Sequence, residues 1–538
     1  MKLDNLALQG NNKVMQAYNN DKAFLHTFFD YGNEAAAYTE RLHELSGRTF
    51  KSGQLAETIR SYMEPFGLSE MADRHLRELA EGAVTVVGGQ QAGILTGPLY
   101  SVHKAITVIL LAEQQRKVLG VPVVPVFWVA GEDHDLNEIN HVYTETAGHA
   151  VKKQYREKFV LKLMASDATY DQEQMAAFVK EIFSRFGETE HTKALLEGVL
   201  QAVEQEETFT QFFVRLMNGL FQEQGLLFID SAFKPLRELE TAYFIRLIEE
   251  SAQLADKIGK KEALFAEQGF GMPIGAESDA ANLFYVHETG RVLLSRRNGD
   301  FVNDSAGVRL SKVEMLRVAE EQPWLLSNNV ATRPMMQDLV FPVLAFVGGP
   351  GEIAYWAVLK EAFHHLGLKM PIIAPRLSIT LVTSQVQHAL TSQSLTVEAV
   401  MTGEAVATRE EFVDGLRDER FYAAIEETET ALRGQYEKMA EIAQSQGPMM
   451  QALLQKNLLF HTKQLDYVKG KAEEAVLVQH DKALRTFSLL EGELFPDGSL
   501  QERLYTPYAY LNSYGPSLIK DLLELPFEMD GTHKIVYL

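Results

Sequence analysis

Two short apolar runs, at residues 84–87 and 123–129, flank a segment with the pattern of a helix that begins near Tyr100. Both runs are rich in β-branched residues, which is typical of strands covered on both faces of a sheet. We expect an amphipathic helix between them, and we expect Gly88 and Gly89 to turn the chain after the first strand. A strand, a helix and a second strand in this order predict a parallel α/β sheet.

Three further runs of the same kind occur at residues 226–229, 343–347 and 372–374. Helical stretches separate neighbouring runs, which predicts an α/β fold with a Rossmann-like, doubly wound parallel sheet. The gaps before the run at 226–229 and before the run at 343–347 are much longer than one crossover helix requires. Both gaps must therefore contain inserted subdomains.

The contents of these two insertions differ. The first has helical patterns around Phe178 and Phe212. The second has a helical pattern near Ile245 and a predicted strand meander over residues 282–303. Its turns are expected at Thr289-Gly290 and Asn298-Gly299, because Gly and Asn tolerate the backbone conformation of tight hairpins.

From about residue 408 the character of the chain changes, and from Phe421 onward the apolar positions follow a four-three repeat, which is typical of coiled coils. Gln446-Gly447-Pro448 interrupts the repeat, so we predict an antiparallel helical hairpin. Each arm would contain roughly 35 to 40 residues and extend some 50 to 60 Å at about 1.5 Å per residue. So long an arm is weakly stable alone, and we favour a homodimer formed through it over an arm folded back on its own core. The seam positions are Phe421, Ile425, Leu432, Met439 and Ala443, followed by Leu454, Leu458, His461, Leu465, Val468, Ala472 and Ala475.

These patterns divide the chain into seven segments. They are residues 1–150 (first part of the Rossmann-like core), 151–222 (helical insertion), 223–236 (core strand), 237–325 (α/β insertion with the meander), 326–390 (second part of the core), 391–490 (antiparallel coiled-coil arm) and 491–538 (C-terminal tail). The tail is aromatic and rich in turn residues, so we expect it to pack on the core or the arm.

Composition excludes several classes of protein. The 538-residue chain has a formal net charge of −22, which argues against nucleic acid as a partner. It contains no apolar run of about 18 residues and no apolar signal core, so we predict a cytoplasmic protein without a membrane partner. It also has no cysteine, which leaves His, Asp and Glu as the strong metal ligands. The missing cysteines fit either chance in a reducing compartment or an enzyme that handles thiols.

Ligands of open α/β sheets bind beyond the carboxyl ends of the strands, and polar residues gather there in this chain. The first such cluster includes Gly88, Gly89 and Gly93 before a helix, a geometry that suits phosphate or carboxylate. It matches neither the dinucleotide fingerprint nor the P-loop. His103 and Lys104 are expected in the first helical turn, where a cation opposes the helix dipole unless an anion lies nearby.

The second cluster follows the run at 123–129. It contains Glu132, Asp133, His134, Asn140 and His141, a density that suits acid–base chemistry, metal binding or the binding of an amine. The two histidines are seven residues apart and the chain has no His-Glu-x-x-His motif, so a metal is the less favoured interpretation. The nearby Asp135 and Glu138 are interpreted as solvated.

The third cluster, at residues 346–356, again joins a strand end to glycines and a helix start. Gly348, Gly349 and Gly351 precede Glu352, and the similarity to the first cluster favours a functional role for both. The segment RLSK at 309–312 is similar to the mobile lysine loop of class I aminoacyl-tRNA synthetases, but it precedes the fourth strand, where that fold would not place it.

The segments GQQAG (89–93), TGPLY (96–100), FWVAGEDHD (127–135), FVGGPGE (346–352) and QER (501–503) resemble those of the bacillithiol biosynthesis cysteine-adding enzymes. With the coiled-coil arm, the resemblance covers nearly the whole chain. It implies a ligase that joins the cysteine carboxyl to the amino group of glucosaminyl malate, with ATP as the expected activating cofactor. It also implies a relative of class I synthetases with a Rossmann-like core and dimerisation through the arm. The chain lacks the His-x-Gly-His signature of those synthetases, so an adenylate step does not follow from the motifs.

Under this resemblance the three clusters receive hypothetical roles. Catalytic roles are assigned to His103 and Lys104, which offset negative charge, and to Glu132, Asp133 and His134, which hold the amine or take its proton. Arg333, with Asn329, is expected to grip the malate carboxylates, because arginine pairs with carboxylates in a bidentate manner. The other predicted substrate-binding residues are Gln90, Gln91, Thr96, Tyr100, Trp128, Asn140, His141, Glu352 and Tyr355. The predicted cofactor-binding residues are Gly88, Gly89, Gly93, Gly348, Gly349 and Gly351, and no metal-ligand set is identified.

Two other functions are compatible with the same features. A metal-dependent amide hydrolase would use the cluster from Glu132 to His141, and stoichiometric zinc would favour it. A non-catalytic dimeric scaffold would use the helical arm and bind no nucleotide or amino acid.

Overall fold

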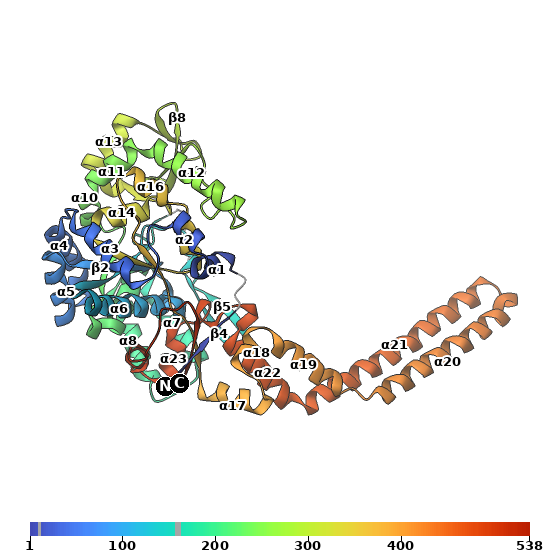
Figure 1. Ribbon diagram of the computed structural model, residues 1–538. Coiled ribbons are helices and arrows are strands. Elements are labelled where there is room, and N and C mark those ends of the chain that lie inside the picture. Colours follow the sequence, from blue (N-terminus) through green and yellow to red (C-terminus); the bar gives the residue numbers. More distant parts are fainter. Residues whose placement is uncertain (9–11, 157–162) are drawn as a thin grey trace. The chain divides into compact units, whose positions relative to one another are not determined.

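The computed structural model describes residues 1–8, 12–156 and 163–538, and the chain forms two compact units (Figure 1). The first unit comprises Met1–Thr144, Val151–Leu381 and Gln501–Leu538. The second comprises Glu145–Ala150 and Val382–Leu500. None of the helices formed by the described residues is both long and apolar enough to span a membrane.

A five-stranded parallel sheet forms the centre of the first unit. Its strands lie in the order β13-β12-β2-β3-β6, and all neighbouring pairs are parallel. All five strands predicted from sequence are present in it, and the α/β, Rossmann-like fold class is confirmed. The strands are β2 Val84–Gln90, β3 Val123–Val129, β6 Leu227–Asp230, β12 Val343–Gly348 and β13 Ile372–Pro375.

The order of these strands along the chain is that of a Rossmann sheet. β2 is central, β3 and β6 continue on one side, and β12 and β13 continue on the other. The direction of winding therefore reverses between β2 and β12. In such sheets the ligand crevice opens at this switch point, beyond the carboxyl ends of the two strands.

The expected turn at Gly88 and Gly89 is wrong. Both residues lie within β2, paired with Phe127 and Trp128, and neither has a positive φ. Glycine is needed at position 88 because a Cβ there would lie 2.6 Å from Cγ2 of Val108 on the neighbouring helix. These glycines allow close packing at the end of the sheet, which periodicity alone does not distinguish from a turn.

The helix α6, Leu99–Leu119, connects β2 to β3 as predicted, but it is not amphipathic. Its residues are buried from Ser101 through Ile109, including the polar His103, Lys104 and Thr107. The helix packs on β2, β3 and β12 and also contacts the C-terminal segment Gln501–Arg503. These three buried polar residues are all hydrogen-bonded: His103 pairs with Glu502, Lys104 donates to the Gly89 carbonyl oxygen, and the Thr107 hydroxyl donates to the His103 carbonyl oxygen and accepts from the Leu377 N–H.

Five helices precede the sheet in the chain. Their starts have local capping signals in several cases; the Ser69 hydroxyl, for example, accepts a hydrogen bond from the Ala72 N–H at 3.1 Å. These helices are α1 Lys13–Asn20, α2 Lys22–Phe28, α3 Ala35–Ser46, α4 Ser52–Met63 and α5 Glu70–Ala80.

The described residues of the insertion between β3 and β6 form a two-stranded sheet and three α-helices. The helices around Phe178 and Phe212 are both present, and the second begins with a capping box formed by Thr208 and Gln211. The elements are β4 His141–Thr146, β5 His149–Gln154, α7 Gln172–Arg185, α8 Thr192–Gln205 and α9 Phe209–Phe221.

The insertion between β6 and β12 contains the predicted meander. It forms part of an antiparallel sheet in the order β10-β9-β8-β7-β11. Asn298 and Gly299 form one turn with φ of 54° and 90°, as predicted, but the other turn is Glu288-Thr289, one residue earlier than expected. The elements are α10 Lys234–Leu239, α11 Thr241–Glu249, α12 Ser251–Glu267, β7 Ala280–His287, β8 Gly290–Arg297, β9 Asp300–Asn303, β10 Val308–Ser311, α13 Lys312–Glu321, β11 Leu326–Asn328 and α14 Arg333–Val340.

Both ends of the chain join one small sheet. β15 lies between β1 and β14 and pairs with β1 in the antiparallel direction. The remaining elements of the first unit are β1 Lys2–Leu6, α15 Pro350–Trp356, α16 Lys360–His365, β14 Ser378–Val382, α23 Pro507–Tyr514, α24 Leu518–Leu523 and β15 His533–Tyr537. Short 3-10 helices are η1 Glu64–Phe66, η2 Ile94–Thr96, η3 Leu136–Glu138, η4 Gln222–Gln224, η5 Pro323–Leu325, η6 Gln444–Gln446, η7 Pro496–Gly498 and η8 Gln501–Arg503.

The second unit consists mainly of helices, and the two longest, α20 and α21, form an antiparallel hairpin (Figure 1). They contain 25 and 32 residues, so the arms are shorter than predicted and extend about 37 and 48 Å. The arm length was overestimated because α19 is a separate helix that ends before α20 begins. The helices are α17 Ser384–Gln393, α18 Val397–Met401, α19 Glu404–Gly415, α20 Glu419–Ala443, α21 Pro448–Gln479 and α22 Asp481–Leu494.

The hairpin seam agrees only in part with the predicted positions. Ile425 and Leu432 of α20 and Leu454 and Leu458 of α21 are half-buried. Thr462, instead of the neighbouring His461, is buried in the seam. Phe421, Met439 and Val468 are exposed, which corrects their assignment to the seam.

Candidate active site

A cavity of about 750 Å³ opens at the carboxyl ends of β2, β3 and β12. This is the position that the strand order specifies for a ligand site. Of the residues predicted to act there, those that line the cavity are Gly89, Gln90, Gln91, Tyr100, Lys104, Trp128, Glu132, Asp133, His134, Asn329, Arg333, Gly349, Gly351, Glu352 and Tyr355.

Lys104 and Glu352 form an ion pair across the switch point, with 2.5 Å between Nζ and Oε2. The ammonium also donates to the Gly89 carbonyl oxygen at 2.6 Å and to Gln90 Oε1 at 3.1 Å. Glu352 Oε2 accepts a further hydrogen bond from the Gly349 N–H at 2.8 Å. Burial lowers the pKa of Lys104, although the carboxylate of Glu352 opposes this shift. The two glycine clusters are thus joined by one buried charge pair.

Asp133 is the most accessible carboxylate among the predicted catalytic residues, with 41% of its side chain exposed. Its Oδ2 accepts a hydrogen bond from Gln91 Nε2 at 3.4 Å, and its Oδ1 lies 3.6 Å from Nη1 of Arg291. Burial raises the pKa of Asp133, and the charge of Arg291 acts in the opposite direction. A carboxylate with these properties is suited to accept a proton from a ligand.

Glu132 is part of a buried ionic cluster. It pairs with the guanidinium of Arg237, which also donates to Glu240 at 2.8 Å. Glu132 Oε2 also accepts a hydrogen bond from the Asn328 N–H at 3.3 Å. Behind it, burial raises the pKa of Asp230 to about 6 and that of Glu240 to about 7. Glu132 lines the cavity, but its ion pair commits it to holding Arg237.

His134 and Arg291 form one wall of the cavity with Phe284. The Arg291 guanidinium lies 3.7 Å from the centroid of the Phe284 ring and 3.4 Å, through Nη1, from His134 Nδ1. Its Nε donates to Ser327 Oγ at 2.8 Å and its Nη2 to the Asn328 carbonyl oxygen at 2.6 Å. Arg291 is therefore held rigidly with one edge toward Asp133.

Arg333 and Tyr355 hydrogen-bond to each other, with the guanidinium as donor. Burial raises the pKa of the Tyr355 phenol, which keeps it protonated. Asn329 lines the cavity, but its amide is occupied by the protein: its Oδ1 accepts from the Ala331 N–H at 2.9 Å and its Nδ2 donates to Asn282 Oδ1 at 2.9 Å. Of the pair expected to grip carboxylates, Arg333 is the better placed.

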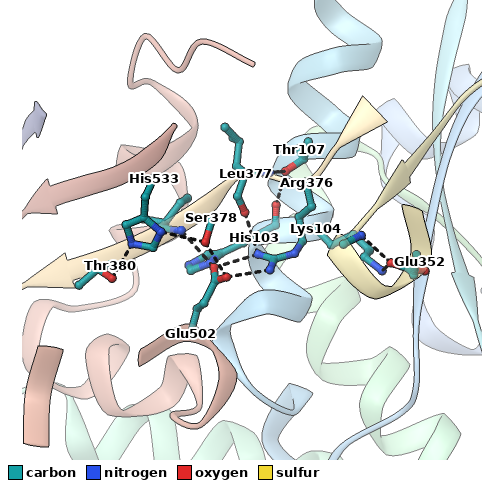
Figure 2. A network of polar contacts seen from close by, with 12 residues as sticks. His103, Lys104, Thr107, Glu352, Arg376, Leu377, Ser378, Thr380, Glu502 and His533 are labelled. Carbon is teal, nitrogen blue, oxygen red and sulfur yellow. Dashed lines mark hydrogen bonds and ion pairs between the residues drawn. The ribbon is translucent and has the colours of Figure 1, made fainter. Parts of the chain in front are cut away.

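Seven predicted site residues do not line the cavity. His103 lies on the other side of α6 from Lys104, and its Nδ1 is 2.9 Å from Glu502 Oε2 (Figure 2). Successive helical residues differ by about 100°, so neighbours in sequence face different surroundings. The full set outside the cavity is Gly88, Gly93, Thr96, His103, Asn140, His141 and Gly348.

The position of the other members of this set is explained by local contacts. Thr96 is buried and donates to the Leu95 carbonyl oxygen at 2.6 Å. Asn140 accepts a hydrogen bond from Gln154 at 3.3 Å. His141 Nδ1 lies 3.1 Å from the Asn137 carbonyl oxygen.

Several cavity residues were missed by the sequence analysis. Arg291, Arg376 and Arg503 come from segments far apart in the chain, so no local motif joins them. Arg503 had a signal as part of the segment QER, and Asn328, which also lines the cavity, is the neighbour of the predicted Asn329. Asp135, interpreted as solvated, is exposed and lines the cavity as well.

The arrangement of the site residues can be compared with what a metal ion and ATP would each require. Among the described residues, no group of three or more His, Asp or Glu side chains could hold a metal ion. The backbone at Gly88 and Gly89 is an extended strand whose Gly89 carbonyl faces Lys104, so it does not form the cradle of N–H groups that a nucleotide phosphate requires. ATP therefore does not fit this segment in the expected way.

The sheet order, the cavity at its switch point and the helical hairpin define a Rossmann-like α/β protein with a coiled-coil unit. Two family models match the chain: "Bacillithiol biosynthesis BshC, N-terminal Rossmann-like domain" over residues 1–377, and "Bacillithiol biosynthesis BshC, C-terminal coiled-coil domain" over residues 379–538. The chain belongs to the BshC family of bacillithiol biosynthesis.

Similar proteins cover the whole chain. Proteins described as "Putative cysteine ligase BshC" from Lysinibacillus sphaericus, Bacillus velezensis and a Geobacillus species are 43%, 36% and 35% identical to it, over 100% of both chains in each case. A solved structure titled as a "putative arginyl t-RNA synthetase" from Campylobacter jejuni aligns with 85% of this chain and 99% of its own at 10% identity. Its TM-score of 0.22 is too low to support an argument about the fold.

Proposed function

We propose that this chain is a cysteine ligase of bacillithiol biosynthesis, which joins the carboxyl group of cysteine to the amino group of glucosaminyl malate. The observation that carries the proposal is the full-length similarity to proteins described as cysteine ligases. The cavity supports it, because both carboxylates and guanidinium groups line it. The proposed substrates carry amino and carboxylate groups, which such a lining complements.

Amide formation requires an activated carboxyl carbon, a deprotonated amine and stabilisation of the developing oxyanion. The amine nitrogen attacks the carboxyl carbon, the new C–N bond forms, the activating group leaves and the amine loses a proton. Asp133 is the proposed acceptor of this proton, because its side chain is accessible in the cavity while partial burial raises its pKa. Glu132 is less suited, because Arg237 occupies it. His134 is proposed to help orient the amine beside Asp133.

Cations of the cavity are proposed to bind the substrate carboxylates. Arg333 is held by Tyr355, and Arg503 has no hydrogen bond or ion pair with any residue that the structure describes. Glu352 is proposed to receive an ammonium group, since its Oε1 has no partner among the described residues while its Oε2 accepts from Lys104 and Gly349. Lys104 would then fix Glu352 and the Gly89 carbonyl, while Gln90, Gln91, Tyr100 and Trp128 form the cavity wall.

Two further parts of the proposal concern the activating group and the oligomer. ATP is proposed as the activating cosubstrate on the basis of the family resemblance. A homodimer through the hairpin is supported by exposed apolar residues on α21: Leu453, Phe460 and Tyr467 lie seven residues apart and are 55–60% exposed. Residues at this spacing lie along one helical stripe, which suits a coiled-coil partner.

The activity is tested by incubating the purified protein with isotopically labelled cysteine, glucosaminyl malate and ATP, and by detecting the labelled amide by mass spectrometry. We expect product that depends on all three components. Parallel reactions without ATP, and with a chemically activated cysteine in its place, separate the ligation from the activation step. Absence of product in every reaction would contradict the proposed function.

A further inference from the structure

Arg376 is a cavity residue that neither a motif nor its chain neighbours identify. It follows β13 directly, and its backbone N–H donates to the Gly348 carbonyl oxygen at the end of β12 at 2.9 Å. Its side chain therefore starts at the carboxyl edge of the sheet. The guanidinium lines the cavity although only 6% of the side chain is exposed, and it lies 5.8 Å from the centroid of the Tyr100 ring.

The guanidinium of Arg376 keeps donors available for a ligand. Nη1 donates to the Leu377 carbonyl oxygen at 2.7 Å and to Glu502 Oε2 at 2.8 Å, and Nη2 donates to Glu502 Oε1 at 2.8 Å. An arginine has five N–H groups. The N–H of Nε and the second N–H of Nη2 have no partner among the described residues. A buried guanidinium with open donors on a cavity wall is suited to bind a carboxylate.

Glu502 holds Arg376 in this orientation (Figure 2). Besides the two bonds from Arg376, the carboxylate accepts hydrogen bonds from the Ser378 hydroxyl at 2.7 Å and the Ile379 N–H at 3.0 Å, and it lies 2.9 Å from His103 Nδ1. Burial opposes its ionisation, but the charge of Arg376 and these hydrogen bonds hold the pKa of Glu502 well below its ordinary value. Both oxygens of the carboxylate thus have hydrogen-bond partners from the protein, which fix its orientation.

Glu502 also supplies the charge that balances Arg376. Burial lowers the pKa of His103 and lowers that of His533 to about 4, so neither imidazole adds positive charge at neutral pH. His533 reaches the carboxylate only through Ser378, with 2.9 Å between His533 Nδ1 and Ser378 Oγ. The buried pair of Arg376 and Glu502 is therefore the charged centre of this network.

We infer that Glu502 is a positioning residue that holds Arg376 as a carboxylate-binding group of the cavity. The inference rests on the proposed function, because it gives Arg376 the carboxylates of glucosaminyl malate as its ligand. Glu502 does not line the cavity and acts only through Arg376. The segment Gln501–Arg503 thus supplies two residues to the site: Glu502, which orients Arg376, and Arg503, a cation that lines the cavity itself.

A double-mutant cycle tests this inference by calorimetry with glucosaminyl malate as the titrant. Glu502→Gln is expected to weaken binding at least about tenfold, since hydrogen bonds to charged groups contribute about 1.5–3 kcal/mol. In an Arg376→Ala background the same substitution should change the affinity by less than about twofold, because residues that act through each other are not additive. Glu502→Asp keeps the negative charge, so this variant is expected to bind glucosaminyl malate more tightly than Glu502→Gln does. If the Glu502→Gln protein does not fold, Glu502→Asp takes its place in the cycle.

Thr380→Val is the matched control. Thr380 is buried in the same network, where its hydroxyl contacts His533 Nε2 at 2.8 Å, but it touches neither Arg376 nor Glu502. The affinity of the Thr380→Val protein for glucosaminyl malate should equal that of the unchanged protein. Unchanged affinity in a folded Glu502→Gln protein would overturn the inference, and so would an equal loss in both backgrounds.

Failure of the proposed function gives a different result. If the unchanged protein does not bind glucosaminyl malate, the assigned substrate is wrong. Crystal structures of the unchanged and Glu502→Gln proteins then decide the positioning role without any ligand. A guanidinium of Arg376 that leaves the cavity wall supports it, and one that stays in place overturns it.

Discussion

A Cβ on Gly89 would lie 2.4 Å from the carbonyl oxygen of Trp128, its register partner on the neighbouring strand. Glycine is therefore required at position 89, where β2 lies beside Trp128 of β3 at the edge of the cavity. Its own carbonyl remains free to accept the hydrogen bond from Lys104. Gly89 thus allows close packing of the sheet and also accepts a hydrogen bond that helps hold the buried ammonium group of Lys104.

Gly89→Ala is expected to destabilise the protein by about 1–3 kcal/mol, because the added methyl group meets backbone that cannot move aside. Chemical unfolding measures the change. Gly351→Ala is the control, since a Cβ there has nothing within 4 Å. Equal stability of the two variants would show that the strand end can relax.

Asp133→Asn is expected to lower kcat by about 10²–10⁴-fold without loss of folding, if Asp133 accepts the amine proton. The unchanged enzyme should lose kcat/KM as the pH falls through the pKa of Asp133, and burial places this pKa above the ordinary value for aspartate. Glu138→Gln, an exposed neighbour outside the cavity, should behave like the unchanged enzyme. A variant at position 133 with full activity would remove this residue from the mechanism.

Asp230 gives a prediction about stability and pH. Burial raises its pKa from 3.8 to about 6, so the folded state binds this proton more tightly than the unfolded state does. Folding is therefore favoured at low pH, and this stabilisation is lost as the pH rises from about 4 through 6. It amounts to about 2 kcal/mol between pH 4.5 and 7.5. In Asp230→Asn, urea unfolding at these two pH values should lack this contribution; an identical pH dependence would contradict the prediction.

Arg503→Ala is expected to weaken binding of glucosaminyl malate with little effect on the free energy of unfolding, because Arg503 is exposed and has no described partner. The loss should be about tenfold or less, and it should shrink at high salt, as expected for an exposed charge. Calorimetry at two salt concentrations measures both effects. Arg317→Ala, an exposed arginine on α13, is the control; an equal effect there would indicate a general response to net charge.

Substitution of both Leu453 and Phe460 with Asp is expected to convert a dimer into a monomer. Charges on the exposed stripe of α21 would be buried without partners in the dimer. Light scattering after gel filtration reports the molar mass. Val118→Asp, at an apolar position of α6 that is 58% exposed, is the control and should leave the mass unchanged. A monomeric unchanged protein would contradict dimerisation through the arm.

The strands of the sheet were predictable because buried parallel strands are continuous runs of β-branched residues. The register between them was not, and it determines that Gly88 and Gly89 continue β2 instead of turning. The length of the hairpin arms was overestimated for a related reason. The segment before α20 is helical too, but this helix, α19, ends at Gly415 and α20 begins only at Glu419.

The candidate site was predictable in part. Lys104, Asp133 and Glu352 belong to clusters at strand ends, and the structure brings them into one cavity with Arg333, which was predicted from the family resemblance. His103 was grouped with Lys104 because they are adjacent, yet the helix turns it toward Glu502. Arg291 and Arg376 could not be selected, because no local pattern distinguishes them from other arginines.

Sequence alone determined the sheet class, the order of its strands along the chain, the helical hairpin and the strand ends near which ligand-binding residues gather. Residue type and periodicity encode these features, because they depend on local conformation and on burial. Only the tertiary structure decided which side chains face the cavity. It also decided that Arg237 forms an ion pair with Glu132 and that Glu502 forms one with Arg376. These contacts join residues more than 100 positions apart. They depend on strand register and helix packing, which a pattern within one segment does not contain.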